Sequence, residues 1–120
     1  MKKTKYTTKK HSKSANKRSD KMFEELGRDI AQYVWENREE LEGVDLWKEI
    51  EYDTLECMLD NDMITYFQFE WSAYEDFYTE IMETLEGFMN EITQLLEADP
   101  TWTIAETETS LYITRRKPEE

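Results

Sequence analysis

Residues 72–98 read SAYEDFYTEIMETLEGFMNEITQLLEA, and this stretch has the strongest helical pattern in the chain. At 100° per residue its apolar side chains fall on one arc of about 140°. Ser72 is a candidate N-cap, and Asp99-Pro100 supplies the stop. The pattern predicts one long amphipathic helix, whose apolar face consists of Tyr74, Phe77, Tyr78, Ile81, Met82, Leu85, Phe88, Met89, Ile92, Leu95 and Leu96.

Two further helices are expected before this one. The first runs from about Met22 to Leu41 after a possible N-cap at Ser19-Asp20, and the second from Asp45 to Asp60 after the break at Gly43. Both have an apolar arc and a charged arc. The apolar positions are Phe23, Leu26, Ile30, Tyr33, Val34 and Leu41 in the first, and Leu46, Trp47, Ile50, Thr54, Leu55, Cys57 and Met58 in the second.

Three short segments have strand character. Residues 63–71, MITYFQFEW, are rich in β-branched and aromatic residues, which favours a strand, although the segment could also extend either flanking helix. Residues 101–106 and 110–116 alternate and are joined at 107–109, so they predict a hairpin with Trp102 and Ile104 facing inward. We therefore expect an α+β fold: three amphipathic helices packed on a small antiparallel sheet with a C-terminal hairpin.

The N-terminal segment differs sharply from the rest of the chain. Residues 1–21 hold nine Lys/Arg and one Asp, a net charge of +8, with only Met1, Tyr6 and Ala15 as apolar side chains. Such a segment buries too little surface to offset chain entropy, which predicts a disordered basic arm. Residues 22–117 are then one acidic domain and 118–120 a short tail. The cations of the arm are Lys2, Lys3, Lys5, Lys9, Lys10, Lys13, Lys17, Arg18 and Lys21.

Two interpretations of the arm stay open. It could tether the chain to RNA, DNA or an acidic protein surface, because a flexible cationic segment attracts phosphates and carboxylates. It could equally be a solubilising tail that folds back on the acidic domain.

Acidic residues dominate the body of the chain. Residues 22–100 hold 23 Asp/Glu and three Lys/Arg, a net charge of −20. Each like-charge pair at i,i+4 costs an isolated helix about 0.2–0.5 kcal/mol, so the exclusion of cations indicates a function. The alternative is that acidic helices keep an aromatic-rich protein soluble. The candidate partner-binding acidic face comprises Glu49, Asp53, Glu56, Asp60, Glu75, Asp76, Glu80, Glu83, Glu86 and Glu91.

Charge spacing sets a condition on nucleic-acid mimicry. Seven carboxylates between Glu75 and Glu97 would span about 33 Å of helix, or one per ~5 Å. DNA carries one phosphate per ~3.4 Å of strand and ~1.7 Å of duplex axis. One helix is therefore too dilute, and duplex density requires that the acidic faces of all three helices adjoin.

Signals of catalysis are weak. Gly27, Gly43 and Gly87 are isolated, so no glycine-rich phosphate loop is present. Cys57 lies in an apolar arc and His11 in the arm, which makes a nucleophile and base pair improbable and leaves no Cys/His zinc cluster. We expect no enzymatic activity, no cofactor and no metal.

One sequence stretch imitates a metal loop. Asp60-Asn61-Asp62 resembles the start of a calcium loop, but Met63 and Ile64 follow where oxygen ligands and a glycine belong, so a helix end or turn is expected. A single cysteine favours a reducing compartment, and no apolar run is long enough to span a membrane. We expect a cytoplasmic protein without membrane contact.

The acidic body, residues 22–99, with three basic residues and interleaved Trp and Tyr, resembles the small phage-type proteins that mimic DNA to block restriction or CRISPR nucleases. The resemblance is one of composition and includes no motif. It implies a non-enzymatic inhibitor that acts in the host cytoplasm on a basic nucleic-acid-binding protein. The basic arm departs from the simplest members, which are acidic throughout, and suggests a composite inhibitor: the body blocks a cationic channel while the arm contacts RNA, DNA or an acidic protein patch.

Two other classes fit the same charge pattern. An immunity or antitoxin-like protein would use the negative face to neutralise a basic toxin by electrostatically steered binding. An adaptor would place the arm on nucleic acid and recruit a partner with the body. Trp35, on the polar side of its helix, is the candidate aromatic contact, because Trp is enriched at interface hot spots. The alternative for Trp35 is packing against the hairpin.

Overall fold

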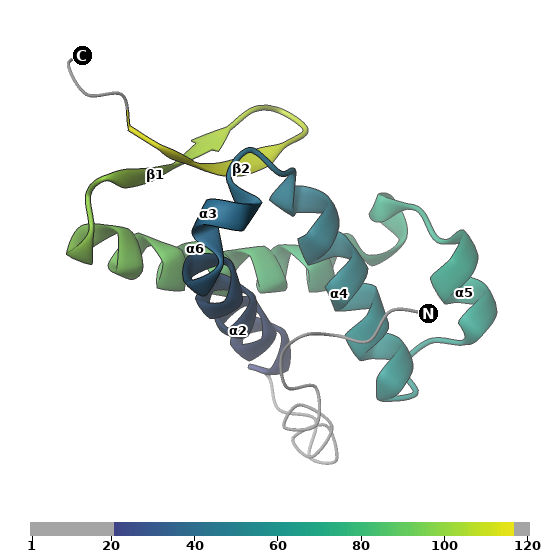
Figure 1. Ribbon diagram of the computed structural model, residues 1–120. Coiled ribbons are helices and arrows are strands. Elements are labelled where there is room, and N and C mark those ends of the chain that lie inside the picture. Colours follow the sequence, from purple (N-terminus) through teal and green to yellow (C-terminus); the bar gives the residue numbers. More distant parts are fainter. Residues whose placement is uncertain (1–20, 117–120) are drawn as a thin grey trace.

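The computed structural model describes residues 21–116, so the predicted arm except Lys21, and the predicted tail, lie outside the described residues. Within this range the fold is α+β, as expected, with five α-helices, one 3-10 helix and a two-stranded antiparallel sheet (Figure 1). The elements are α2 (Met22–Glu36), α3 (Arg38–Leu41), α4 (Leu46–Asp60), α5 (Tyr66–Trp71), η1 (Tyr74–Phe77), α6 (Tyr78–Ala98), β1 (Trp102–Glu106) and β2 (Leu111–Arg115).

Helices α2 and α6 meet backbone to backbone. A Cβ atom built on Gly27 of α2 would lie 2.0 Å from the carbonyl oxygen of Thr84, and one built on Gly87 of α6 would lie 2.1 Å from that of Glu24. No side chain of any size fits between backbones at this separation. The two glycines therefore allow the close α2–α6 contact on which the rest of the domain is built.

Helix α4 completes the helical core. Asp45 caps it by accepting a hydrogen bond from the Trp47 N–H at 3.0 Å. Inside the core the Thr54 hydroxyl bonds to the Thr84 hydroxyl of α6 at 2.8 Å, which satisfies two buried polar groups and fixes the register of α4 on α6. The fully buried large side chains around this pair include Leu26, Ile30, Val34, Leu46, Ile50, Ile81, Phe88 and Ile92.

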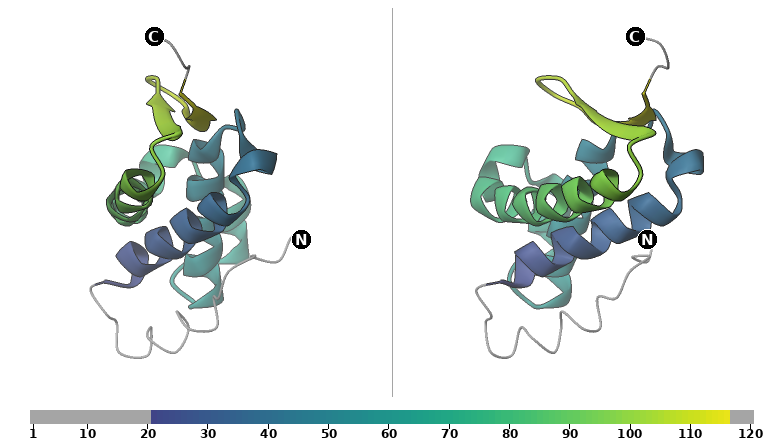
Figure 2. Two further views of the ribbon diagram at one scale, coloured as in Figure 1. Left: turned by 60° about the vertical axis from the view of Figure 1, so that its left-hand side comes forward. Right: turned by 90° about the vertical axis from the view of Figure 1, so that its left-hand side faces the viewer.

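The predicted hairpin is present and lies above α6, beside α3 and the start of α4 (Figures 1 and 2). Trp102 pairs with Arg115 and Glu106 with Leu111 in an antiparallel register. Trp102, Leu111 and Ile113 are buried, whereas Ile104 is half-buried. The apolar face of the hairpin thus closes the core, and the sheet contains only these two strands among the described residues.

The predicted first helix, residues 22–41, is divided at Asn37. This residue has φ −117° and ψ 26°, and its side chain donates to the Tyr33 carbonyl at 2.9 Å, which competes with continuation of the helix. The N-cap position of α2 is Lys21, without a side-chain capping bond, and the predicted cap at Ser19-Asp20 lies outside the described residues.

The prediction of a strand at residues 63–71 is wrong. Thr65 and Gln68 form a capping box: the Gln68 N–H donates to the Thr65 hydroxyl at 3.2 Å, and the Thr65 N–H donates to the Gln68 amide oxygen at 2.9 Å. This local device starts helix α5 and overrides the strand propensity of the aromatic residues. Asp62 turns the chain before it, with φ 58°.

The start predicted for the third helix is also displaced. Ser72 is the C-cap of α5, and the chain passes through η1 before α6 begins at Tyr78. The Asp76 carboxylate accepts the Ala73 N–H at 2.9 Å and holds this 3-10 turn. The predicted end at Asp99-Pro100 is confirmed, since α6 ends at Ala98 with Asp99 as its C-cap.

Candidate acidic and aromatic interaction surfaces

The acidic stripe predicted on the third helix forms two rows in α6. Glu80 and Glu91 are half-buried and lie in register with buried Thr84 and Gly87, on the side that faces α2. Gln32 of α2 donates a hydrogen bond to the Glu91 carboxylate. The second row is exposed and consists of Glu83, Glu86 and Glu97, with Glu75 and Asp76 exposed on η1 before it. Only the second row faces solvent along its whole length.

The acidic stripe predicted on the second helix is not a uniform surface. Asp53 is 1% exposed and Glu56 is 5% exposed, whereas Glu49 is half-buried and Asp60 is exposed. None of the four carboxylates is left without an interaction, as buried charges require. In this conformation Asp53 and Glu56 are not accessible to a partner.

The carboxylates of α4 impose a negative local potential. Burial is the main cause that raises the pKa of the Cys57 thiol to about 12, and Asp60 adds to it by charge repulsion. Tyr52 also has a raised pKa, from burial first and then from Glu56 and Glu49. Cys57 is fully buried and stays protonated at neutral pH, so it is no thiolate nucleophile.

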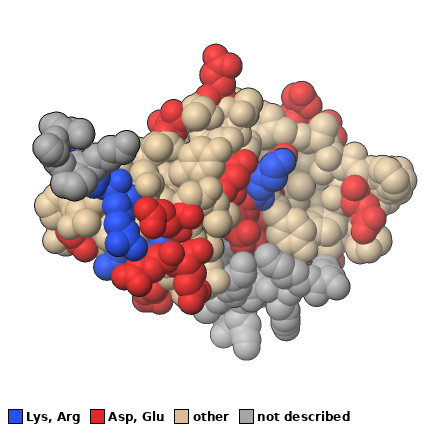
Figure 3. Space-filling view, turned by 45° about the horizontal axis from the view of Figure 1, so that its top comes forward, with Lys and Arg blue, Asp and Glu red and all other residues tan. Residues whose placement is uncertain are grey.

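Exposed carboxylates occur in each of the helices and in the hairpin. The face in Figure 3 shows them in several separate groups with uncharged surface between them, and Lys or Arg side chains lie beside the group at the lower left and beside the one near the centre. At the α2–α6 contact, the backbone of Glu24 lies against Gly87, one turn from both Glu83 and Glu91. The backbone positions of Glu24, Glu83 and Glu91 therefore lie near one another there.

Trp35 lies in an intramolecular contact. Its side chain is half-buried and packs against the hydrophobic core. The Arg38 guanidinium carbon lies 4.1 Å from the centroid of the Trp35 ring and 5.5 Å from that of Trp102 in the hairpin. Arg38 also forms an ion pair with Asp99 at 3.6 Å. A role of Trp35 in partner binding stays a prediction.

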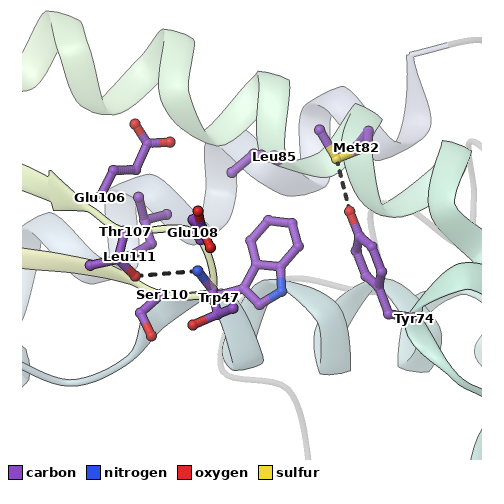
Figure 4. Close-up of a pocket in the computed structure, with 10 residues that line it drawn as sticks. Trp47, Tyr74, Met82, Leu85, Glu106, Thr107, Glu108, Ser110 and Leu111 are labelled. Atoms are coloured by element: carbon purple, nitrogen blue, oxygen red, sulfur yellow. Dashed lines mark hydrogen bonds between the residues drawn. The ribbon is translucent and has the colours of Figure 1, made fainter.

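A small pocket lies where the hairpin loop meets the helices. Its volume is about 190 Å³, and Figure 4 shows the Trp47 ring between Leu85 and Tyr74, with the Tyr74 hydroxyl directed at the Met82 sulfur. Hairpin residues, among them Glu106, form the opposite wall. The pocket is below the ~300–1,000 Å³ typical of cofactor and substrate sites and is about the size of one side chain.

The sequence prediction missed a group of exposed aromatic residues on α5. Phe67 and Trp71 are 71% and 73% exposed, and Tyr66 is 60% exposed. The aromatic content of residues 63–71 was the available signal, but it was interpreted as favouring a strand. Correct recognition of the Thr65–Gln68 capping box would have placed these side chains on a short surface helix.

Residues 21–116 contain neither a candidate metal site nor a candidate membrane-spanning helix. No group of three or more His, Cys, Asp or Glu side chains there has the arrangement of a metal site. No helix in this range has the length and apolar composition needed to cross a bilayer. All predicted arm cations except Lys21 lie outside the described residues.

In comparisons with known proteins, no family model, no curated protein and no solved structure matches this chain.

Proposed function

We propose that the chain is a non-enzymatic inhibitor that binds the nucleic-acid channel of a cationic enzyme, such as a CRISPR effector or a restriction enzyme. Its exposed carboxylates take the place of phosphates, and the basic arm, residues 1–21, makes a second contact.

The observation that carries this proposal is the exclusion of cations from most of the domain. Residues 49–114 contain 17 Asp/Glu and no Lys or Arg. Like-charge neighbours cost stability, and single lysines would relieve that cost. A partner with a Lys/Arg-lined groove turns the same repulsion into favourable binding, because counterions are released from the groove as they are when DNA binds.

The contact must be distributed over several elements. Glu83, Glu86 and Glu97 extend over about 21 Å of α6, one exposed carboxylate per ~7 Å, which is more dilute than a DNA strand. Additional exposed carboxylates lie in η1 and in the hairpin loop, including Glu75 and Glu108. Mimicry by this domain therefore means several acidic groups that each meet a separate cationic group of the partner.

A second candidate is an immunity-type protein that neutralises a basic toxin. The separate acidic groups and the exposed aromatic residues of α5 favour it, because tight protein interfaces combine aromatic anchors with a charged rim. The two candidates differ in salt dependence: mimicry of DNA requires a steep loss of affinity with salt, and an aromatic anchor does not.

The test is DNA cleavage by a panel of purified restriction and CRISPR nucleases in the presence of the full chain. We expect inhibition of at least one nuclease, and its loss in the variant Glu83→Lys/Glu86→Lys/Glu97→Lys, whose three positions are exposed. The matched control is Glu36→Lys/Glu39→Lys/Glu40→Lys, with the same charge change on α2 and α3. Equal inhibition by both variants and the wild type would exclude the α6 row as the contact.

A further inference from the structure

Helix α5 presents an apolar surface that the domain itself does not use. Phe67 and Trp71 are one helical turn apart, and their ring centroids are 6.5 Å apart, so they form one continuous surface. A large aromatic side chain buries ~150–250 Å² when fully enclosed. At 71% and 73% exposure, the two rings leave roughly 300 Å² in solvent. Apolar patches of this size on soluble proteins commonly mark interaction sites.

The other side of α5 explains why these rings face outward. Phe69 is half-buried, and its ring packs edge-on against Tyr52 of α4 with centroids 5.5 Å apart. The Thr65–Gln68 capping box fixes the start of the helix. Because α5 is attached to α4 through Phe69, which lies two residues from both Phe67 and Trp71, those two rings are held away from the core. Alanine at either position would leave the packing of the domain intact.

A shallow groove continues this surface toward η1. It has a volume of about 290 Å³ and is lined by Phe67 and Trp71 of α5 and by Phe77 of η1, among others. The hydroxyl oxygen of Ser72 is buried next to it and has no hydrogen-bond partner among the described residues. The surface therefore offers two protruding rings and an adjacent hollow to a partner. We call this set, Phe67, Trp71, Ser72 and Phe77, the α5 face.

Charges around the α5 face restrict what can bind it. Glu70, Glu75 and Asp76 are exposed beside it, and the nearest Lys or Arg in sequence are Lys48 and Arg115. Two copies joined through this face would oppose carboxylate to carboxylate. Single-stranded nucleic acid also stacks on aromatic rings, but it needs cations along its phosphates. Anionic membranes require basic residues as well.

We propose that the α5 face is the anchor for a partner protein whose complementary surface has an apolar cleft bordered by Lys or Arg. Trp71 and Phe67 enter the cleft, and the three carboxylates beside them pair with the cationic border. Aromatic side chains that fill a pocket inside a charged rim are the usual hot spots of protein interfaces. The inference rests on the proposed function in taking the partner to be a cationic protein.

The test uses defined peptides and the full chain. The first probe is a fluorescein-labelled amphipathic peptide of about 14 residues with Leu on one helical face and Arg on the other, long enough to form a helix on binding. The second probe has Glu in place of Arg, and the third has Lys and Ser without apolar residues. Binding is followed by fluorescence anisotropy.

We expect the Leu/Arg peptide to bind the wild type and to bind Phe67→Ala/Trp71→Ala at least tenfold more weakly. Val44→Ala removes an exposed apolar side chain in the loop before α4 and serves as the matched control with unchanged affinity. The Lys/Ser peptide measures simple charge attraction and should bind both proteins equally and weakly. Circular dichroism of each variant checks that the fold is retained.

Three results would overturn the inference. They are equal binding of the Leu/Arg peptide by the double alanine variant, equal binding of the Leu/Glu peptide by the wild type, and a wild-type dimer in sedimentation that Trp71→Ala converts to a monomer. Failure of the proposed function is separable: it would appear as no inhibition of any nuclease, while peptide binding still depends on Trp71. If the double alanine variant binds the Leu/Arg peptide as tightly as the wild type does, and nuclease inhibition is retained, only the proposed role of the α5 face is refuted.

Discussion

The contact between Gly27 and Gly87 makes a sharp prediction about stability. In Gly27→Ala the new Cβ would lie 2.0 Å from the Thr84 carbonyl oxygen and 2.6 Å from the Phe88 nitrogen. Both obstacles are backbone atoms, which cannot rotate away as a flexible side chain could. Helices α2 and α6 must separate by roughly 1.4 Å to restore ordinary van der Waals contact.

The expected cost follows from two opposing effects. Overpacking in a core costs typically ~1–3 kcal/mol, and here the upper end applies because the whole helix pair must shift. Alanine regains about 1 kcal/mol over glycine inside a helix. We expect a net loss of about 2 kcal/mol, which lowers the melting temperature of a domain of this size by about 8–16 °C.

Urea denaturation and thermal melts followed by circular dichroism would measure the loss. Gly87→Ala, with its Cβ 2.1 Å from the Glu24 carbonyl oxygen, should give a similar result. Asn90→Ala is the control, because Asn90 is exposed on α6 and its replacement changes helix propensity without a clash. If Gly27→Ala were as stable as Asn90→Ala, the close α2–α6 contact would be refuted.

Three further predictions concern charge and packing. The Cys57 thiol, with its pKa raised to about 12, remains protonated in the native state but ionises in the unfolded chain as pH rises from 9. The free energy of unfolding of the wild type should therefore fall relative to that of Cys57→Ala, by at most ~1.4 kcal/mol per pH unit. Urea midpoints between pH 8 and 10.5 measure this, and parallel pH profiles would contradict it. Arg38→Ala should lower the free energy of unfolding by about 1–2 kcal/mol in the same urea assay, because it removes the stacking on Trp35 and a hydrogen bond to the Trp35 carbonyl. Arg28→Ala removes only an exposed ion pair and should lower it by less than ~0.5 kcal/mol. Deletion of residues 1–20 should preserve the circular dichroism spectrum and weaken binding to RNA or DNA in a filter assay; unchanged affinity would favour the interpretation as a solubilising tail.

The comparison of α6 with α5 shows how much of the fold the sequence determines locally. The apolar arc of residues 72–98 repeats over several turns, so the helix could be predicted from periodicity, and its end from the Asp99-Pro100 stop signal. Residues 63–71 are too short for periodicity to separate helix from strand, and a single capping box decides the outcome. The pairing of Gly27 with Gly87 is a contact between distant segments, which no local pattern reveals.

The candidate site was predictable in composition but not in accessibility. The exclusion of cations is visible in the sequence, and the exposed row Glu83, Glu86 and Glu97 follows from the helical wheel of α6. The burial of Asp53 and Glu56 could not be foreseen, because a wheel assigns charges to solvent without knowledge of neighbouring segments. The exposure of Trp71 was missed for the opposite reason, since aromatic residues are expected to be buried.

The central claim, that exposed carboxylates of this domain occupy a nucleic-acid groove, is tested most directly by competition on an inhibited nuclease. The full chain is bound to the immobilised enzyme, and duplex DNA is titrated at 50 and 200 mM salt. We expect DNA to displace the chain, and the affinity of the chain to fall at least tenfold between the two salt concentrations, as counterion release requires. Binding that neither DNA nor salt changes would contradict the claim and leave an aromatic, immunity-type interface as the explanation.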